Sequence, residues 1–267
     1  MQNPSILISG SLAYDFLFTF PGVFQNEILT GNVGNLSVAF VVTGKDIFFG
    51  GCAGNIVFNA KLLKEDFLLL GIAGKDFTPY EKWLKKHKIN VSHVTREKAH
   101  FTSSATIVTD QRSQQITFFH PGAATYSNRH IGEIKKTIKK SAKNLKLALI
   151  SPNDKNFMMA SIEACRQNKI PFIFDPGQAM PLYKPHELKN ILEHSFGMTL
   201  NEYELNLFKK LTGMSLKEIL NICELLIVTL GEKGSEIYFR GMRIPIKAVK
   251  PKKIIDPTGC GDAFRAG

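Results

Sequence analysis

Cysteine is scarce in this sequence of 267 residues, and its four residues lie far apart. Cys52, Cys165, Cys223 and Cys260 show none of the paired spacings that bind zinc. They also lack the density of the disulfide frameworks that hold small secreted domains together. We therefore expect reduced cysteines, no zinc site and no disulfide framework.

Long apolar runs are missing as well. The most apolar stretch, Phe67 to Gly74, is far shorter than the roughly 20 residues that a membrane-spanning helix needs. The start of the chain, Met1 to Gly10, lacks the basic segment of a secretory signal. These features predict a soluble cytoplasmic protein without a membrane partner. With 44% hydrophobic and 21% charged residues, the composition suits one large globular domain of the α/β class.

Acidic residues are outnumbered, because 23 Asp and Glu stand against 34 Lys and Arg, for a formal charge of +11. The excess is spread over lysine-rich segments such as 82–88 and 135–146, and no nucleic-acid-binding motif accompanies it. We interpret these segments as solvated helix faces, whose charge would also aid the capture of an anionic nucleotide. We expect no nucleic-acid partner.

Two common phosphate-handling signatures are absent from the sequence. It contains neither the Gly-x-x-x-x-Gly-Lys-Ser/Thr phosphate loop nor the His-Arg-Asp signature of protein kinases. A chain that handles phosphate without them must hold it in another way.

The stretch from Asp256 to Gly267 offers such a way. Pro257 and Gly259 permit a tight turn, Gly261 lets the backbone approach a ligand, and the residues after Asp262 indicate the first turn of a helix. Amides at such a helix start attract a phosphate or a developing anion, and Asp262 could accept a proton from an attacking hydroxyl. A plain helix cap after a glycine turn is the alternative.

A second candidate site lies near the start of the chain. Ser5 to Leu12 is a β-rich apolar run, and Asp15, with Ser11 nearby, follows its end, where α/β sheets bind ligands. A solvated loop aspartate is the alternative. Further on, Gly50 and Gly51 precede an amphipathic helix over residues 53–64, and Asn55 offers a donor and an acceptor to a vicinal diol. Glycine-rich helix starts are nevertheless common.

Several short strands fall outside the helix–strand alternation and predict a separate small sheet. The segments are Phe16 to Phe20, Leu36 to Thr43 and Ile47 to Phe49, with a turn-rich link at Thr30 to Asn35, and a hairpin of Ser103 to Asp110 and Gln115 to Phe119. Their exposed apolar residues favour a lid or a dimer surface. Phe119 could stack on a flat base, although an aromatic residue in a strand is more often part of a core.

From Asn128 onward, helices and strands alternate, which predicts a parallel sheet with its ligand site at the carboxyl ends of the strands. Asn201 and Glu204 follow one such strand, and Thr229, Gly231 and Gly234 close another. Asn201 as a helix cap with Glu204 as its capping-box partner is the structural alternative.

Taken together, these motifs resemble the ribokinase-like (PfkB) family of carbohydrate and nucleoside kinases over nearly the whole chain. The resemblance rests on the order of Asp15, Gly50-Gly51 with Asn55, Asn201 with Glu204, Gly231 with Gly234, and Gly259-Cys260-Gly261-Asp262 led by Asp256 and Thr258. The segments Phe16 to Gly22, Phe119 to Ala123 and Phe174 to Gln178 look most like bacterial adenosine kinases.

The resemblance implies a three-layer sandwich with a central, mostly parallel sheet and a small β lid, built as one domain over 1–267. The lid strands would come from about 16–49 and 103–120. Family members usually continue with further helices, whereas this sequence stops five residues after Asp262. We therefore expect the C-terminal helices of the family fold to be missing.

The resemblance also implies transfer of the ATP γ-phosphoryl group to a hydroxymethyl group, with Mg²⁺ as cofactor. Asp262 would be the general base, beside the backbone of Gly259, Cys260 and Gly261. The substrate would be bound by Ser11, Asp15, Gly50, Gly51, Asn55 and Phe119. The nucleotide would be bound by Asn201, Thr229, Gly231 and Gly234, and Glu204 would hold the metal through water.

The segments that resemble bacterial adenosine kinases favour an adenosine-like nucleoside as the substrate. Ala39 and Ala105 fall where adenosine-specific members are expected to carry a hydroxyl and an aromatic residue, so the nucleoside is left open. A sugar kinase of the ribose or fructose type is one alternative, and a truncated, inactive ligand-binding protein is another. A monomer and a homodimer formed through the lid are both consistent with the sequence.

Overall fold

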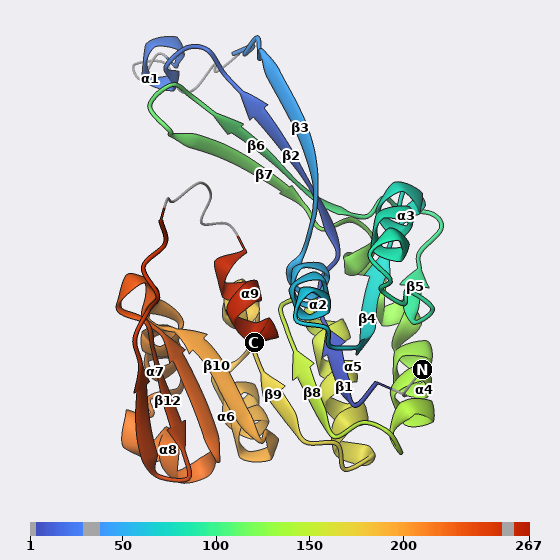
Figure 1. Ribbon diagram of the computed structural model, residues 1–267, viewed down its shortest axis with the longest axis vertical. Coiled ribbons are helices and arrows are strands. Elements are labelled where there is room, and N and C mark those ends of the chain that lie inside the picture. The colour runs from blue at the N-terminus through green and yellow to red at the C-terminus, as the bar shows by residue number, and fades with distance from the viewer. Residues whose placement is uncertain (1–3, 29–37, 253–258) are drawn as a thin grey trace.

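The computed structural model describes residues 4–28, 38–252 and 259–267. Within these ranges, one large and one small sheet organise the chain (Figure 1). The large sheet has nine described strands, in the spatial order β13 (Met242–Ile246), β12 (Ser235–Phe239), β11 (Leu225–Thr229), β10 (Gly197–Asn201), β9 (Phe172–Phe174), β8 (Leu147–Ile150), β1 (Ile6–Ser9), β4 (Phe67–Ala73) and β5 (Val94–Arg96).

The large sheet is parallel from β11 to β5, and only β12 and β13 join it antiparallel. Its strands read as continuous apolar runs because both faces are covered. In β4, Leu68 and Leu70 belong to the hydrophobic core on one face, whereas Leu69 belongs to the core on the other. This alternation, which is the period of a β-strand, makes the sheet the middle of three layers.

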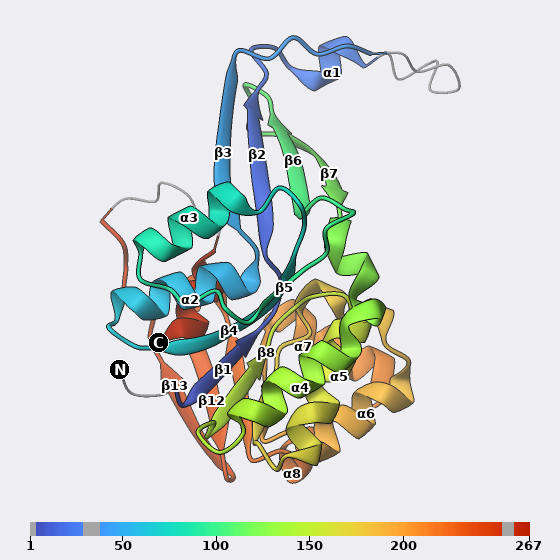
Figure 2. The same cartoon turned by 90° about the vertical axis from the view of Figure 1, so that its right-hand side faces the viewer.

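Two groups of helices form the outer layers (Figure 2). The first covers β1 and β4 and consists of α2 (Cys52–Leu62) and α3 (Thr78–Lys86), with α9 (Cys260–Ala266) packed on α2. The second consists of α4 (Ile131–Ser141), α5 (Lys155–Gln167), α6 (Pro185–His194), α7 (Glu202–Thr212) and α8 (Leu216–Ile222). No helix of the described residues is long and apolar enough to cross a bilayer.

The small sheet projects from one end of the large one (Figure 1) and is called the lid sheet below. Its strands are, in spatial order, β3 (Gly44–Gly50), β2 (Ala13–Thr19), β6 (Ser103–Thr109) and β7 (Gln115–His120), with the short helix α1 (Phe24–Glu27) beyond β2. The link from β1 to β2 is Gly10 to Leu12, and only Gly51 separates β3 from α2. The chain therefore passes between the lid sheet and the large sheet through very short links.

Among the described residues, 3-10 helices lie in three connections, two of them from a strand to a helix and one between strands β11 and β12. They are η2 (Gly122–His130), η3 (Gly177–Leu182) and η4 (Gly231–Lys233). The first two follow β7 and β9 and thus lie near the junction of the two sheets.

The predicted three-layer α/β architecture with a small second sheet is confirmed. One predicted strand is wrong: of Leu36 to Thr43, the described residues 38–43 form no strand, and β3 begins at Gly44. Phe40 in this segment packs edge-on against Phe20 and Phe24, whereas Val41 is exposed. The predicted link from Thr30 to Asn35 lies outside the described residues.

The packing of α2 on α3 leaves no room for a side chain at Gly54. An added Cβ would overlap the hydroxyl of Tyr80, which is fully buried and donates a hydrogen bond of 2.9 Å to the Gly50 carbonyl. We predict that Gly54→Ala lowers the free energy of unfolding by about 1–3 kcal/mol. Gly132 in α4 has open space around it, so Gly132→Ala should raise stability by about 0.5 kcal/mol. Urea unfolding of both variants measures the difference, and equal effects would contradict this account.

Candidate active site

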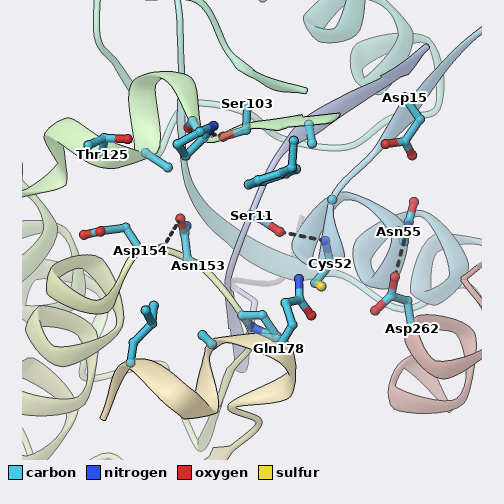
Figure 3. A pocket seen from close by; sticks show the side chains of 18 residues that line it. Ser11, Asp15, Cys52, Asn55, Ser103, Thr125, Asn153, Asp154, Gln178 and Asp262 are labelled. Atoms are coloured by element: carbon cyan, nitrogen blue, oxygen red, sulfur yellow. Dashed lines mark hydrogen bonds between the residues drawn. The ribbon is translucent and has the colours of Figure 1, made fainter. Parts of the chain in front are cut away.

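A cavity of about 390 Å³ lies where the lid sheet meets the carboxyl ends of the large sheet (Figure 3). Strands β2, β6 and β7 of the lid sheet line one side of it. The segments that follow β1, β8 and β9, together with the first turns of α2 and α9, line the rest. Ligands of parallel α/β sheets bind at this edge, because the loops leaving the strands converge there.

Asp15 points into the cavity from β2. An added Cβ on Gly50 of the neighbouring strand β3 would overlap its carboxylate, so this glycine makes room for Asp15. Burial raises the pKa of Asp15, because the protein around the carboxylate disfavours its charged form. A ligand hydroxyl that donates to this carboxylate would recover part of that desolvation cost.

Gly51 and Ser11 fix the start of α2 beneath the cavity. Gly51 has φ +86°, and an added Cβ would lie 2.6 Å from the Ser11 carbonyl oxygen and 2.8 Å from the Ala13 nitrogen. The Ser11 hydroxyl accepts a hydrogen bond of 3.0 Å from the Cys52 N–H (Figure 3), and the Ser11 carbonyl accepts one of 3.1 Å from Ala53. The structure thus uses both predicted residues to hold the helix that carries Asn55.

Asn55 and Asp262 meet across the cavity wall although 207 positions separate them in the chain. The Asn55 amide donates a hydrogen bond of 2.8 Å to the Asp262 carboxylate (Figure 3). Burial raises the pKa of Asp262, whereas the hydrogen bond from Asn55, the charge of Arg265 and the Cys52 thiol lower it. The carboxylate is therefore a stronger base than a solvated one, yet it is held in its charged form by specific neighbours.

The helix that carries Asp262 begins earlier than the sequence suggests. α9 begins at Cys260, so Asp262 lies in its first turn, where the prediction had placed the helix after Asp262. Gly259 at φ +76° allows this early start, and its carbonyl accepts the first helical hydrogen bond, 2.8 Å from the Ala263 nitrogen. The side chain of Cys260 is exposed. Asp256 and Thr258 lie outside the described residues.

Five of the six predicted substrate residues line this cavity. They are Ser11, Asp15, Gly51, Asn55 and Phe119, and Gly50 lies behind Asp15. Phe119 is 64% exposed, so its ring is available to a ligand and is not part of the core.

The predicted nucleotide residues form a second group at the same edge of the large sheet. Asn201 ends β10 beside Thr229 at the end of β11, and Gly231 and Gly234 follow. None of these residues lines the cavity as described. Gly234 also has a packing role, because an added Cβ would overlap the Ile246 carbonyl.

Asn201 and Glu204 form a capping box at the start of α7. The Asn201 side chain accepts from the Glu204 N–H at 2.8 Å, and the Glu204 carboxylate accepts from the Asn201 N–H at 2.8 Å. The helix-capping alternative that the sequence offered for this pair is thus present in the structure. The capping box places the Glu204 carboxylate at the edge of the sheet.

A magnesium site would depend on few protein ligands. Among the described residues, no three His, Cys, Asp or Glu side chains are grouped to hold a metal ion. Mg²⁺ commonly keeps several waters and binds one or two carboxylates together with substrate phosphates. Glu204 fits such a site as a single carboxylate that acts through water.

The sequence analysis missed several residues of the site. Asn153 follows β8, its Oδ1 accepts the Asp154 N–H at 2.8 Å (Figure 3), and its Nδ2 is buried without a partner among the described residues. Gln178 lines the cavity from η3. A signal existed, because both residues lie in the segments that follow strands of the parallel sheet. Asp175, which directly follows β9, carried the same signal, whereas its partner Arg265 did not.

Comparison with known proteins places these observations in a family context. A family model described as pfkB family carbohydrate kinase matches residues 44–267. The nucleoside kinase of Methanocaldococcus jannaschii is 34% identical over 222 residues, which cover 82% of this chain and 70% of that protein. The structure of Burkholderia thailandensis nucleoside kinase in complex with inosine has a TM-score of 0.82 at 38% identity, covering 98% of this chain and 81% of that one. Its structure in complex with ADP-inosine has a TM-score of 0.80 at 38% identity, covering 98% and 80%.

The role of Asn201 as a helix cap at α7 can be tested by protein stability, without any ligand. Asn201→Ala should lower the free energy of unfolding by about 1 kcal/mol, because the Glu204 N–H loses its acceptor. Asn201→Ser keeps an acceptor at the cap and should restore most of that stability. Urea unfolding measures both effects, and a serine variant as unstable as the alanine variant would rule out the cap as the source of stability.

Proposed function

Because this chain belongs to the pfkB family of carbohydrate kinases, phosphotransferases with an alcohol group as acceptor, we propose that it transfers the γ-phosphoryl group of ATP to the hydroxymethyl group of a nucleoside. The observation that carries the proposal is the Asn55–Asp262 hydrogen bond in the wall of a cavity that also holds Asp15. It brings a candidate base and candidate sugar-binding groups to one place. The similar proteins of M. jannaschii and B. thailandensis are nucleoside kinases, which supports the nucleoside as acceptor.

The cavity fits a nucleoside better than a free sugar. Asp15 and Asn55 offer acceptors and a donor to the ribose hydroxyls. The lining also includes apolar groups, namely Phe119, Pro121, Ala124, Pro152 and Leu182. A base would bury these groups and stack on Phe119, whereas a ribose or fructose would leave them in contact with water. A sugar kinase of the same family is therefore the second candidate.

In the proposed reaction, Asp262 takes the proton of the acceptor hydroxyl as its oxygen forms a bond to the γ-phosphorus. The bond from that phosphorus to the bridging oxygen breaks, and ADP leaves. The backbone of Gly259, Cys260 and Gly261 would stabilise the charge on the transferred group. Burial raises the pKa of Asp262, which suits a general base working near neutral pH.

The nucleotide would occupy the edge formed by β10 and β11, where Asn201, Thr229, Gly231 and Gly234 lie. The B. thailandensis complex with ADP-inosine supports a nucleotide beside the nucleoside. Glu204 would hold Mg²⁺ through water, and the bound ion would neutralise charge on the phosphate oxygens. An adenosine-like nucleoside is the first acceptor to test, with inosine beside it.

The role of Asp262 predicts a loss of turnover without a loss of fold. Asp262→Asn keeps the shape of the side chain but removes the base, so kcat should fall by about 10² to 10⁴. In the unsubstituted protein, kcat/KM should rise with pH as Asp262 loses its proton, which gives the pH profile an acidic limb. This limb should lie at a higher pH than the usual pKa range of an aspartate, because burial raises the pKa of Asp262. Coupled ADP-release assays with adenosine, inosine, ribose and fructose measure both. Full activity of the Asn variant, or turnover of the sugars alone, would overturn the proposal.

The role of Asp15 predicts a defect in acceptor binding. Asp15→Ala removes an acceptor from the ribose hydroxyls, and KM for the nucleoside should rise at least about 10-fold. Asp46 lies on β3 of the same sheet but is exposed and does not line the cavity, so Asp46→Ala is the matched control. Calorimetric titration with nucleoside should show the same contrast. Equal KM values for the two variants would remove Asp15 from the acceptor site.

A further inference from the structure

A buried ion pair lies directly behind Asp262. Asp175 follows β9 and is fully buried, and Arg265 reaches it from α9 with a side chain that is 16% exposed. Arg265 Nη2 donates a hydrogen bond of 2.9 Å to Asp175 Oδ1, and Nε lies 2.5 Å from Oδ2. The second contact is a charge contact only, because Nε and Oδ2 have no aligned hydrogen-bond partner among the described residues.

Arg265 also touches the turn that carries the reactive carboxylate. Its Nη1 lies 3.8 Å from Asp262 Oδ1, too far for a hydrogen bond but close enough for a strong charge interaction. A Cβ on Gly261 would lie 2.8 Å from the same Nη1, so this glycine also makes room for the guanidinium. One cation therefore contacts the end of β9 on one side and the first turn of α9 on the other.

Stability alone is a weak reason for such a pair. Taking two charges out of water costs much of what their attraction returns, and apolar replacements of buried pairs are often neutral or stabilising. Burial raises the pKa of Asp175 to about 7, although Arg265 lowers it. The position of the pair, one helical turn from Asp262, points to a role at the reaction site.

We propose that Arg265 is a positioning residue for the phosphoryl transfer: anchored on Asp175, it fixes the first turn of α9 and keeps Asp262 in its charged, proton-accepting form. This inference rests on the kinase function proposed above. Asp175 acts through Arg265 and touches neither substrate.

Several groups face Asp262 and must be counted in its titration. Asn55 and Cys52 approach from α2, Arg265 from α9 and Asp175 from the end of β9, and Glu204 acts on Asp175 from α7. Burial raises the pKa of the Cys52 thiol, which is thus neutral at physiological pH. Arg265 is the cation that lowers the pKa of Asp262 among the described residues.

The test uses the pH profile of kcat/KM for the preferred nucleoside with two substitutions of Arg265. Arg265→Met keeps the bulk but removes the charge, so the pKa of Asp262 should rise and the acidic limb should move to higher pH. Its kcat should fall by about 10²-fold, because the base is also less well placed. Arg265→Lys keeps the charge but not the forked contacts, so kcat should fall while the acidic limb stays in place.

A double-mutant cycle tests whether Asp175 acts through Arg265. Asp175→Asn should lower kcat in the unsubstituted protein but cause no further loss in the Arg265→Met background. The double variant also leaves no unpaired buried charge, so it should melt at a higher temperature than Arg265→Met alone and remain measurable. Arg240→Met, which breaks the exposed ion pair with Glu224, is the control. It should leave kcat and the acidic limb of the pH profile unchanged.

The outcomes separate the two proposals. If the unsubstituted protein phosphorylates no nucleoside, the proposed function fails. If it does, but Arg265→Met leaves the acidic limb in place or shifts it no further than Arg265→Lys, the positioning role is overturned. Additive losses of kcat for Asp175→Asn and Arg265→Met would equally overturn the claim that Asp175 acts through Arg265.

Discussion

The hydrogen bond between Asn55 and Asp262 is the contact on which the site depends. It joins the helix that follows the lid sheet to the helix near the end of the described chain, and the two helices pack along their length. The segments that follow β1, β8 and β9 of the parallel sheet reach the same cavity, because parallel strands place their carboxyl ends at one edge. The contact lies in the wall of the cavity that Asp15 also lines, so one hydrogen bond joins the two helices beside the candidate acceptor site.

Burial sets the chemistry of this edge. Asp15, Asp175 and Asp262 all have raised pKa values because they lie in a poorly hydrated region, and each is compensated differently. Asp262 receives a hydrogen bond and a nearby cation, Asp175 receives a direct ion pair, and Asp15 faces the open cavity. The aspartate with the least compensation is thus the one best placed to gain from a ligand hydroxyl.

The sequence predicted well those features that have local causes. The apolar runs of the parallel strands, the glycine at Gly51 and the polar residues after strand ends follow from rules that act within a few residues, and the ribokinase-like fold that they suggested is confirmed. The false strand at 36–43 failed because Phe40 satisfies its apolar character by packing on other aromatic rings. The Arg265–Asp175 pair was missed because its partners are 90 positions apart, and nothing in the two segments that contain them indicates that they meet.

The short links of the lid sheet limit how it can move. One link is the single residue Gly51 and another is Gly10 to Leu12, and a residue spans at most about 3.6 Å. The sheet can tilt about these links, but it cannot slide along the cavity or withdraw far from it. A cavity that accepts a wider range of ligands would therefore require new side chains on β2, β6 and β7, since the backbone of the lid sheet can move only a short distance.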